Sequence, residues 1–411
     1  MRKSDFSMKK NTSNLKTNHI PQPKRLRFSE FLAFKTGLLI LLIGFSSCKQ
    51  GEKDTTPLAA SAQKVNINYA EGFSITDYGD YKILAVTEAF PGSDQVYNYA
   101  LVKPGKSVPD SLKIDATIQI PVQRIVVTST THIPSLDMLG VENTLVGFPN
   151  LDYISSQKTR DRIALGEIQE LGQNESINTE TTINLDPDVV VCFGVEGQNK
   201  SLNSLQRAHI PVLYNGDWVE HSPLGKAEWI KFFGALYNKQ ELADSLFNSI
   251  ATQYEEAKKL SLQAKEKPTV LSGSLFKDVW YLPHGDSWAA QLIADANADY
   301  LYKNTQGTGS IALSLEEVLD TGQQADFWIA PNAFESYAEL ENANPVYSKF
   351  KAFQEKKIYG FASAKGETGG LIYYELAPNR PDWVLQDLVH IFHPNLLPDY
   401  EPHFFKPLAE H

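Results

Sequence analysis

The chain of 411 residues has only two cysteines, Cys48 and Cys192. Two thiols exclude a disulfide-stapled fold and a cysteine-rich zinc centre, because each of these needs several thiols. Cys192 lies in the apolar run Val189–Phe193, where we predict a small core residue.

Sequence signatures of several enzyme classes are also missing. There is no G-x-S-x-G nucleophile elbow and no H-E-x-x-H metal motif. The glycines of Gln306–Ser310 lack the Gly-Lys-Ser/Thr ending of a phosphate-binding loop. His390 and His393 could bind a metal, but such a pair at a helix end more often serves the helix dipole. We therefore expect a protein that is not an enzyme and has no cofactor.

The apolar run near the N-terminus, Leu38–Phe45, is shorter than the roughly 20 residues that span a bilayer. A leader with nine Lys or Arg and two acidic residues precedes it, and Ser46-Ser47-Cys48 follows. This order of segments resembles a bacterial lipoprotein signal. The resemblance implies cleavage before Cys48, acylation of its thiol and a place outside the cytoplasm. The alternative is a membrane-anchor helix with a free Cys48 thiol.

Basic residues are scarce once this leader is removed. The remaining chain holds 29 Lys and Arg against 47 Asp and Glu, a formal charge of −18. Such a surface disfavours nucleic acid and anionic lipid as partners and suits a basic protein partner.

The hydrophobic pattern changes along the chain and indicates an α/β protein. After a small, polar stretch, strand-like alternation with Gly and Pro between the strands predicts an antiparallel β extension without functional residues. From Arg124, short apolar runs alternate with helical stretches, which is typical of mostly parallel sheets. Two helices, the second one long, interrupt this pattern and predict a rigid connection between two α/β lobes. The predicted organisation is signal peptide 1–47, tether 48–63, β extension 64–123, first lobe 124–225, interdomain helices 226–266 and second lobe 267–411.

Four segments resemble the class III solute-binding proteins of bacterial ABC importers, the iron-siderophore and vitamin B12 type. These segments are Gln123–His132, Asn178–Val191, Leu313–Leu319 and Asn379–Asp382. The second comes close to the family pattern n-x-E-x-i-x-x-L-x-P-D-l-V-i. The resemblance covers roughly residues 121–396 and implies a ligand held between two rigid lobes.

The resemblance also implies one exposed glutamate on each lobe that pairs with arginines of a dimeric permease. The matching residues are Glu180 and Glu316, with Glu317 as a competitor for Glu316. Two carboxylates far apart on rigid lobes would orient the protein on a two-fold partner. The alternative is that each is an ordinary first-turn glutamate favoured by the helix dipole.

Ligand contacts are expected in the loops that follow the carboxyl ends of the sheet strands. The candidates are Thr131, His132, Trp218, Lys277, Trp280, Tyr281, Trp288, Tyr374 and Arg380. Aromatic rings suit a large, partly apolar ligand. Each of three candidates has a simpler alternative. Trp280 lies inside a predicted strand, where a core position is more common. His132 could be a polar loop residue whose hydrogen bonds are made within the protein, and Arg380 could have only a structural role.

The predicted function is that of a monomeric lipoprotein of the periplasm that captures an iron-siderophore complex and delivers it to an inner-membrane ABC importer. The membrane and leaflet of the anchor stay open. Cobalamin or haem is the alternative cargo. A zinc or manganese binder would need converging His, Asp and Glu ligands and usually a His-rich loop, which is missing. A two-lobed chelatase would work in the cytoplasm, which the lipoprotein leader contradicts.

Overall fold

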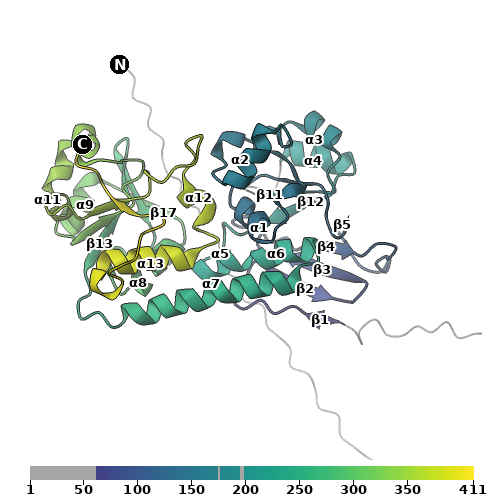
Figure 1. Cartoon of the computed structure of the whole chain (residues 1–411), viewed down its shortest axis with the longest axis horizontal. Coiled ribbons are helices and arrows are strands. Elements are labelled where there is room, and N and C mark those ends of the chain that lie inside the picture. The colour runs from purple at the N-terminus through teal and green to yellow at the C-terminus, as the bar shows by residue number, and fades with distance from the viewer. Residues whose placement is uncertain (1–61, 175, 195–198) are drawn as a thin grey trace, which may run out of the picture. The chain divides into compact units, whose positions relative to one another are not determined.

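A computed structural model describes residues 62–174, 176–194 and 199–411 (Figure 1). The predicted fold class is confirmed, because two α/β lobes with central, mostly parallel sheets follow one another along the chain. None of the helices in this described part is long and apolar enough to cross a membrane. The predicted signal peptide, Cys48 and the tether up to residue 61 lie outside the described residues.

A five-stranded sheet begins the described part, with its strands paired in chain order. The strands are β1 (Gln63–Lys64), β2 (Phe73–Asp77), β3 (Tyr81–Val86), β4 (Tyr97–Val102) and β5 (Ala116–Gln119). The prediction of a fully antiparallel extension is wrong at its end, because β4 and β5 are parallel. Gln63, which we assigned to the tether, is already in β1. The sheet is also not a separate unit, since Phe73, Ile75 and Leu84 share one buried core with the first lobe.

The first lobe is built on a parallel sheet with the strand order β12-β11-β6-β7-β8. Ile125, Val126 and Val127 of its central strand β6 are all buried, which explains the continuous apolar run in the sequence. The strands are β6 (Ile125–Val127), β7 (Leu145–Phe148), β8 (Gln169–Glu170), β11 (Val189–Phe193) and β12 (Val212–Asn215). The helices are α1 (His132–Met138), α2 (Gln157–Ala164), α3 (Thr179–Leu185) and α4 (Lys200–Arg207). Between them, β9 (Gly172–Gln173) and β10 (Ser176–Ile177) form a small hairpin.

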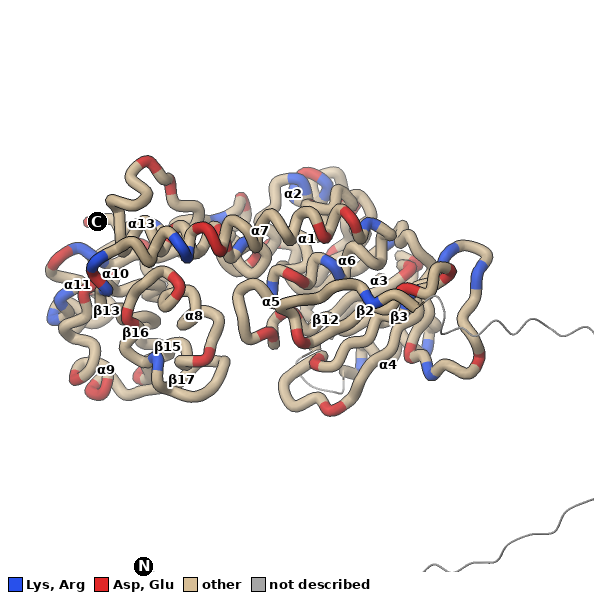
Figure 2. The backbone as a smooth tube through the Cα atoms, turned by 90° about the horizontal axis from the view of Figure 1, so that it is seen from below, with Lys and Arg blue, Asp and Glu red and all other residues tan. Residues whose placement is uncertain are grey.

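Three helices, one more than predicted, connect the lobes: α5 (Pro223–Glu228), α6 (Ile230–Leu236) and α7 (Gln240–Ser261). Figure 1 shows α7 running beneath both lobes. Phe247 and Ile250 of α7 belong to the core of the first lobe, whereas Tyr254 and Ala257 belong to that of the second. Charged residues are spread along the helix in Figure 2. Because one continuous helix of about 33 Å is packed into both cores, it resists bending between them.

The second lobe contains two sheets. The larger has the order β16-β13-β18-β19-β20, parallel except for β20, and the smaller is the antiparallel sheet β14-β15-β17. The strands are β13 (Thr269–Ser272), β14 (Ser274–Phe276), β15 (Val279–Pro283), β16 (Asp299–Tyr300), β17 (Ser310–Leu313), β18 (Phe327–Ile329), β19 (Ile358–Gly360) and β20 (Lys406–Pro407). The helices are α8 (Trp288–Asp295), α9 (Leu315–Gly322), α10 (Tyr337–Ala343), α11 (Lys351–Gln354), α12 (Ile372–Leu376) and α13 (Pro381–Phe392).

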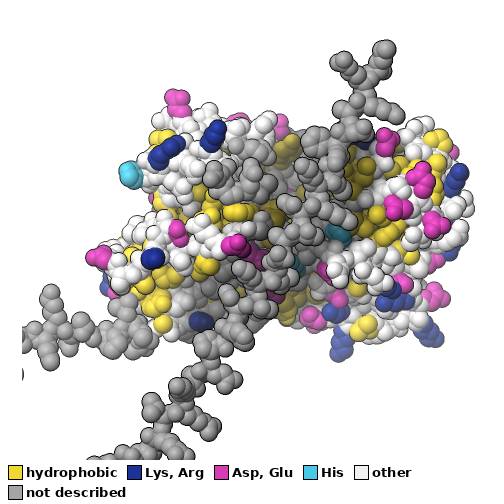
Figure 3. Space-filling model, turned by 180° about the vertical axis from the view of Figure 1, so that it is seen from behind, with side chains coloured by type: hydrophobic (Ala, Val, Ile, Leu, Met, Phe, Trp, Pro, Cys, Tyr) yellow, Lys and Arg dark blue, Asp and Glu magenta, His cyan; other side chains and the backbone are white. Residues whose placement is uncertain are grey.

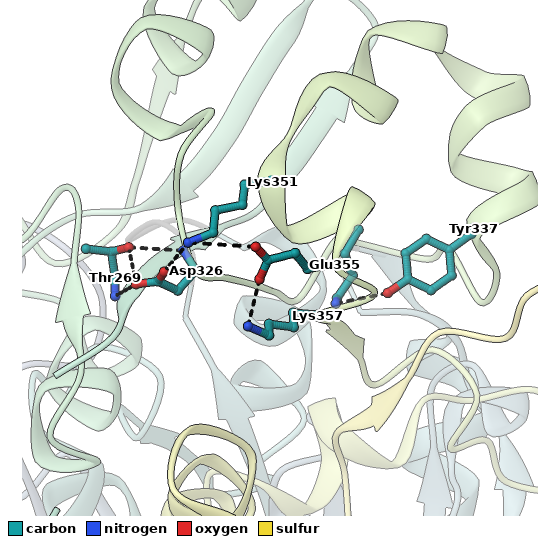
Figure 4. Close-up of polar contacts among 7 residues, drawn as sticks. Thr269, Asp326, Tyr337, Lys351, Glu355 and Lys357 are labelled. Carbon is teal, nitrogen blue, oxygen red and sulfur yellow. Dashed lines mark hydrogen bonds and ion pairs between the residues drawn. The ribbon is translucent and has the colours of Figure 1, made fainter. Parts of the chain in front are cut away.

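Both lobes tie their central strands together with an aspartate that directly precedes a strand. Asp188, before β11, accepts hydrogen bonds from the backbone N–H groups of Gln123 and Arg124 at 2.7 and 2.9 Å. Asp326, before β18, accepts them from the N–H and the hydroxyl of Thr269 at 2.9 and 2.8 Å (Figure 4). Each lobe thus has an aspartate before a central strand, and this aspartate accepts hydrogen bonds at the start of the neighbouring strand.

We expect Asp326→Asn to lower the free energy of unfolding at pH 7, because the change removes the ion pair with Lys351 and weakens the hydrogen bonds from Thr269. The loss should be only about 1 kcal/mol, since part of the side chain is exposed and solvent screens the ion pair. Burial opposes ionisation of Asp326, but hydrogen bonds from Lys351 and Thr269 outweigh it and hold the pKa at about 2. This stabilisation is therefore present above the ordinary pKa of 3.8 and is lost as the pH falls through 2. Urea denaturation measures the change, with the exposed Asp320→Asn as the control. Equal losses in the two variants would contradict the assignment.

Candidate functional site

A cavity of about 830 Å³ lies between the two lobes. Glu88 and residues 90–94 and 218–221 line it on the side of the first lobe. Pro283 and residues 287–289 and 308–310 line it on the side of the second. Each lobe contributes one tryptophan, Trp218 and Trp288. Figure 3 shows hydrophobic side chains between charged ones on one face of the molecule. The size is that of a site for a small organic ligand or cofactor.

A buried lysine lies close to both tryptophans. The Lys226 ammonium group donates hydrogen bonds to the carbonyls of Asp217 and Trp218 at 3.0 and 2.9 Å, which fixes the turn that carries Trp218. The same ammonium lies 5.7 Å from the centre of the Trp288 ring. Burial lowers the pKa of Lys226 to about 8, against the attraction of Asp217 and Glu220. Lys226 therefore holds the backbone of Trp218 and lies near the ring of Trp288.

The charged side chains that line the cavity are mostly acidic. Glu88, Asp94 and Glu220 line it together with His221, and none of its described lining residues is Lys or Arg. The Glu220 carboxylate is largely occupied, since it accepts hydrogen bonds from the Trp229 indole N–H and the Gly72 N–H, both at 2.9 Å. Burial raises the pKa of Glu220, and these hydrogen bonds oppose the rise. Such a lining favours a neutral or cationic ligand over a strongly anionic one.

A second cavity, of about 390 Å³, adjoins the first and is lined by the second lobe alone. Of the predicted ligand contacts, Tyr281, Trp288 and Tyr374 line this cavity. Trp288 lines both cavities, so the two are adjacent at this ring.

Thr131 and His132 lie at the start of α1 and line neither cavity. The Thr131 hydroxyl donates a hydrogen bond to Asp217 at 2.7 Å. His132 is completely buried, with its ring packed on Phe233 at 5.4 Å, and neither ring nitrogen has a hydrogen-bond partner among the described residues. Burial lowers the pKa of His132 to about 4, despite the charge of Asp217. His132 is therefore a neutral core residue at pH 7, and we leave it out of the proposed site.

Three more candidates line neither cavity. Trp280 is fully buried and packs on Trp328, with ring centres 5.4 Å apart. Lys277 is at the tip of the β14–β15 hairpin, where its ammonium lies over the Phe276 ring. Arg380 forms an ion pair with Asp382 at 2.6 Å and lies over the Trp383 ring at 3.4 Å. Their side chains are thus occupied elsewhere in the fold.

One wall of the interlobe cavity was not predicted from the sequence. Residues 88–94 connect β3 to β4 in the sheet to which we assigned no function. In the sequence, Pro91-Gly92 predicts a turn between two strands and gives no sign of a binding role. Phe361 and residues 308–310 were also missed, because nothing local distinguishes them from ordinary loop residues.

The lobes also contact each other directly through hydrogen bonds. Glu375 of α12 is buried and accepts hydrogen bonds from the N–H groups of Ser155 and Ser156 at 2.6 and 2.9 Å. Asn379 bridges the Thr131 carbonyl, at 2.8 Å, and the Ser135 hydroxyl, at 2.9 Å. Burial raises the pKa of Glu375 to about 7, although the two N–H groups favour its ionised form.

Within the part of the chain that the structure describes, no three His, Cys, Asp or Glu side chains are grouped so that they could hold a metal ion.

Comparison with known proteins gives matches in both sequence and fold. Residues 125–364 match the family model described as periplasmic binding protein. An uncharacterized lipoprotein of Methanocaldococcus jannaschii is 25% identical over an alignment of 374 residues, which covers 86% of this chain and 86% of the relative. A periplasmic solute-binding protein of Staphylococcus epidermidis, described as a possible iron-binding protein, is similar in fold, with a TM-score of 0.51 and 18% identity over 66% of this chain and 99% of that chain. The periplasmic heme-binding protein HutB of Vibrio cholerae has a TM-score of 0.50 and 17% identity over 64% of this chain and 99% of its own.

Proposed function

Because the chain belongs to the family of periplasmic binding proteins, we propose that it captures a metal chelate between its lobes and delivers it to an ABC importer. The observation that carries the proposal is the cavity of about 830 Å³ with one tryptophan from each lobe, Trp218 and Trp288. Flat aromatic surfaces on opposite walls bind the organic shell of a chelate with little loss of side-chain entropy.

The chelate that we propose is an uncharged or cationic iron-siderophore complex. Carboxylates line the interlobe cavity, and Lys226 is turned toward backbone carbonyls and the back of Trp288. A catecholate complex with several negative charges would meet these carboxylates without a compensating cation. Cobalamin, and haem with its two propionates, are the alternative cargoes, and the propionates meet the same objection.

The cargo is tested by titrating the protein with a ferric hydroxamate, a ferric catecholate, cobalamin and haemin while following tryptophan fluorescence. We expect the neutral or cationic hydroxamate to quench Trp218 and Trp288 at the lowest concentration. Native mass spectrometry of protein purified from its host gives an independent reading of the bound mass. Failure of all four compounds to bind would reject a chelate as the cargo.

We propose a lipid anchor at Cys48, which places the protein outside the cytoplasm on a membrane. The residues that support it are the basic leader, the short apolar run and the small residues before Cys48. A relative from Methanocaldococcus jannaschii that aligns with 86% of this chain is also described as a lipoprotein.

Glu180 and Glu316 are the proposed contacts with the permease. Each is the second residue of its helix, α3 or α9, and each side chain is exposed. The competitor Glu317 is already engaged, because its carboxylate accepts hydrogen bonds from the N–H and hydroxyl of Ser314 in a capping box. Each helix leads to the aspartate that ties the central strands of its lobe, Asp188 or Asp326, which supports an equivalent placement of the two glutamates.

We expect the double variant Glu180→Lys/Glu316→Lys to slow association with the permease about tenfold at low salt, because reversed charges repel the arginines that steer docking. Ligand affinity should not change, since neither residue lines a cavity. Transport into vesicles and stimulation of the importer's ATPase measure the effect. The matched control is Glu255→Lys/Glu256→Lys, which makes the same charge change on the exposed face of α7. Equal defects in the two double variants would mean that net charge, and not docking, is responsible.

A further inference from the structure

The cavity of about 390 Å³ in the second lobe, called here the side cavity, differs in chemistry from the interlobe cavity that it adjoins. None of its described lining residues is charged, whereas the interlobe cavity has three carboxylates. The two share Pro283, Trp288, Ala289 and Ser310. A polar cavity and an apolar cavity are therefore adjacent to each other.

The side cavity has an apolar floor and an aromatic rim. The floor includes the buried side chains Leu282, Leu292, Ile293, Val384 and Leu388. Phe276, Tyr281 and Tyr374 at the rim are 58%, 45% and 54% exposed. Single exposed aromatic rings are common on protein surfaces, but three of them gathered around one cavity indicate a binding surface.

The walls of the side cavity are held in fixed positions. Phe361 and Tyr373 stack face to face with ring centres 4.3 Å apart. Gly273 has a positive φ of 78°, and a Cβ there would lie 1.9 Å from the Tyr281 carbonyl oxygen, so only glycine lets the hairpin strand that carries Tyr281 approach this closely. Ala330 has a left-handed φ of 51°, a conformation that a non-glycine residue keeps only when its surroundings impose it. A preformed cavity binds a rigid apolar group with little cost of ordering.

We propose that the side cavity binds an apolar arm of the chelate, an aryl ring or a short alkyl chain, while the metal centre occupies the interlobe cavity. This inference rests on the proposed function and makes it more specific: the natural cargo is an amphipathic chelate. Trp288 lies at the junction, where it contacts both parts of such a ligand.

The first test compares two ferric hydroxamates of equal charge, one with a phenyl or octyl arm and one without. We expect the arm to increase affinity for the native protein about tenfold or more, since each buried methylene group favours binding. Tyr374→Ala and Phe276→Ala should remove most of this advantage and leave the affinity for the unarmed chelate unchanged. Both side chains are more than half exposed, so the variants should fold. Tyr69→Ala, an exposed tyrosine that lines neither cavity, is the matched control.

The second test uses N-phenyl-1-naphthylamine, an uncharged probe that fluoresces in apolar surroundings, and needs no chelate. We expect binding to the native protein and to Tyr69→Ala, and at least tenfold weaker binding to Tyr374→Ala. If the probe binds in this way but neither hydroxamate does, the proposed function fails and the apolar side cavity stands. If the hydroxamates bind equally well, or if the probe does not distinguish Tyr374→Ala from the native protein, the apolar-arm proposal is wrong and the proposed function is unaffected.

Discussion

Replacing Glu228 by alanine is expected to lower the free energy of unfolding by about 3 kcal/mol. The change breaks a buried ion pair with Lys231, which keeps Asp244 at 3.3 Å, and it leaves three backbone N–H groups without their acceptor. Glu228 is completely buried on α5 and forms an ion pair at 2.9 Å with Lys231, whose side chain is 3% exposed. Its carboxylate also accepts hydrogen bonds from the N–H groups of Asn68, Tyr69 and Ala70 at 2.6 to 3.0 Å. The Glu228 carboxylate thus holds the first described segment of the chain to α5, and Lys231 of α6 adds a hydrogen bond to the Asn66 carbonyl at 2.8 Å.

Urea denaturation of the variant measures this loss, and the exposed Glu256→Ala on α7 is the matched control, expected to change stability by less than about 0.5 kcal/mol. Glu228→Met/Lys231→Met should lose less than Glu228→Ala, because it leaves no buried charge behind. Hydrogen exchange at Tyr69 and Ala70 should rise in both variants, since their N–H groups lose the acceptor. A loss below 1 kcal/mol in Glu228→Ala would show that the carboxylate does not hold this segment.

Raising the pH from 5 to 8 is expected to increase opening of the contact between Glu375 and residues 155–156, by at most a factor on the order of 100. The pKa of Glu375 is raised to about 7 by burial when the contact is closed, and opening returns the carboxyl to water, where its ordinary pKa is 4.5. The closed contact is therefore most stable below pH 4.5, and its stability is lost as the pH rises through 7. Hydrogen exchange at Ser155 and Ser156, corrected for intrinsic rates, reports this opening.

Local exchange is the right measurement because other groups titrate in the same range. Burial raises the pKa of the neighbouring Asp137, which accepts a hydrogen bond from the Ser156 hydroxyl. The lowered pKa of His132 has the opposite effect, since its contribution to stability is present above pH 6.5 and is lost as the pH falls through 4. Glu375→Gln should flatten the pH dependence at Ser155, whereas Glu367→Gln, an exposed change in the adjoining loop, should preserve it. A flat profile in the native protein would contradict a raised pKa of Glu375.

Many features of the fold could be read from local patterns. Apolar strands such as Val189–Phe193 and the helical spacing that leads into α7 predicted two α/β lobes with a rigid connection, and the structure confirms that fold class. The prediction succeeded because strand and helix periodicity is a property of near neighbours in sequence.

The neighbouring residues Trp280 and Tyr281 show what local patterns do not predict, namely which of two aromatic side chains is buried. Successive side chains of a strand point to opposite faces, and here Trp280 is fully buried while Tyr281 is 45% exposed at the rim of the side cavity. Both are aromatic, so the sequence alone could not tell which face the rest of the lobe covers. The wall formed by residues 88–94 was missed for a related reason, since it comes from a sheet that local alternation placed outside the lobes.

By itself, the sequence determined the order and type of the strands and helices and the two helix-start glutamates, because these depend on residues a few positions apart. Only the tertiary structure decided which aromatic rings face a cavity, and which carboxylates are buried against partners far along the chain. Glu228 meets a backbone segment 158 to 160 residues away, and Glu375 meets one 219 to 220 residues away. Such contacts depend on how whole lobes and sheets pack, and no periodicity of neighbouring residues carries that information.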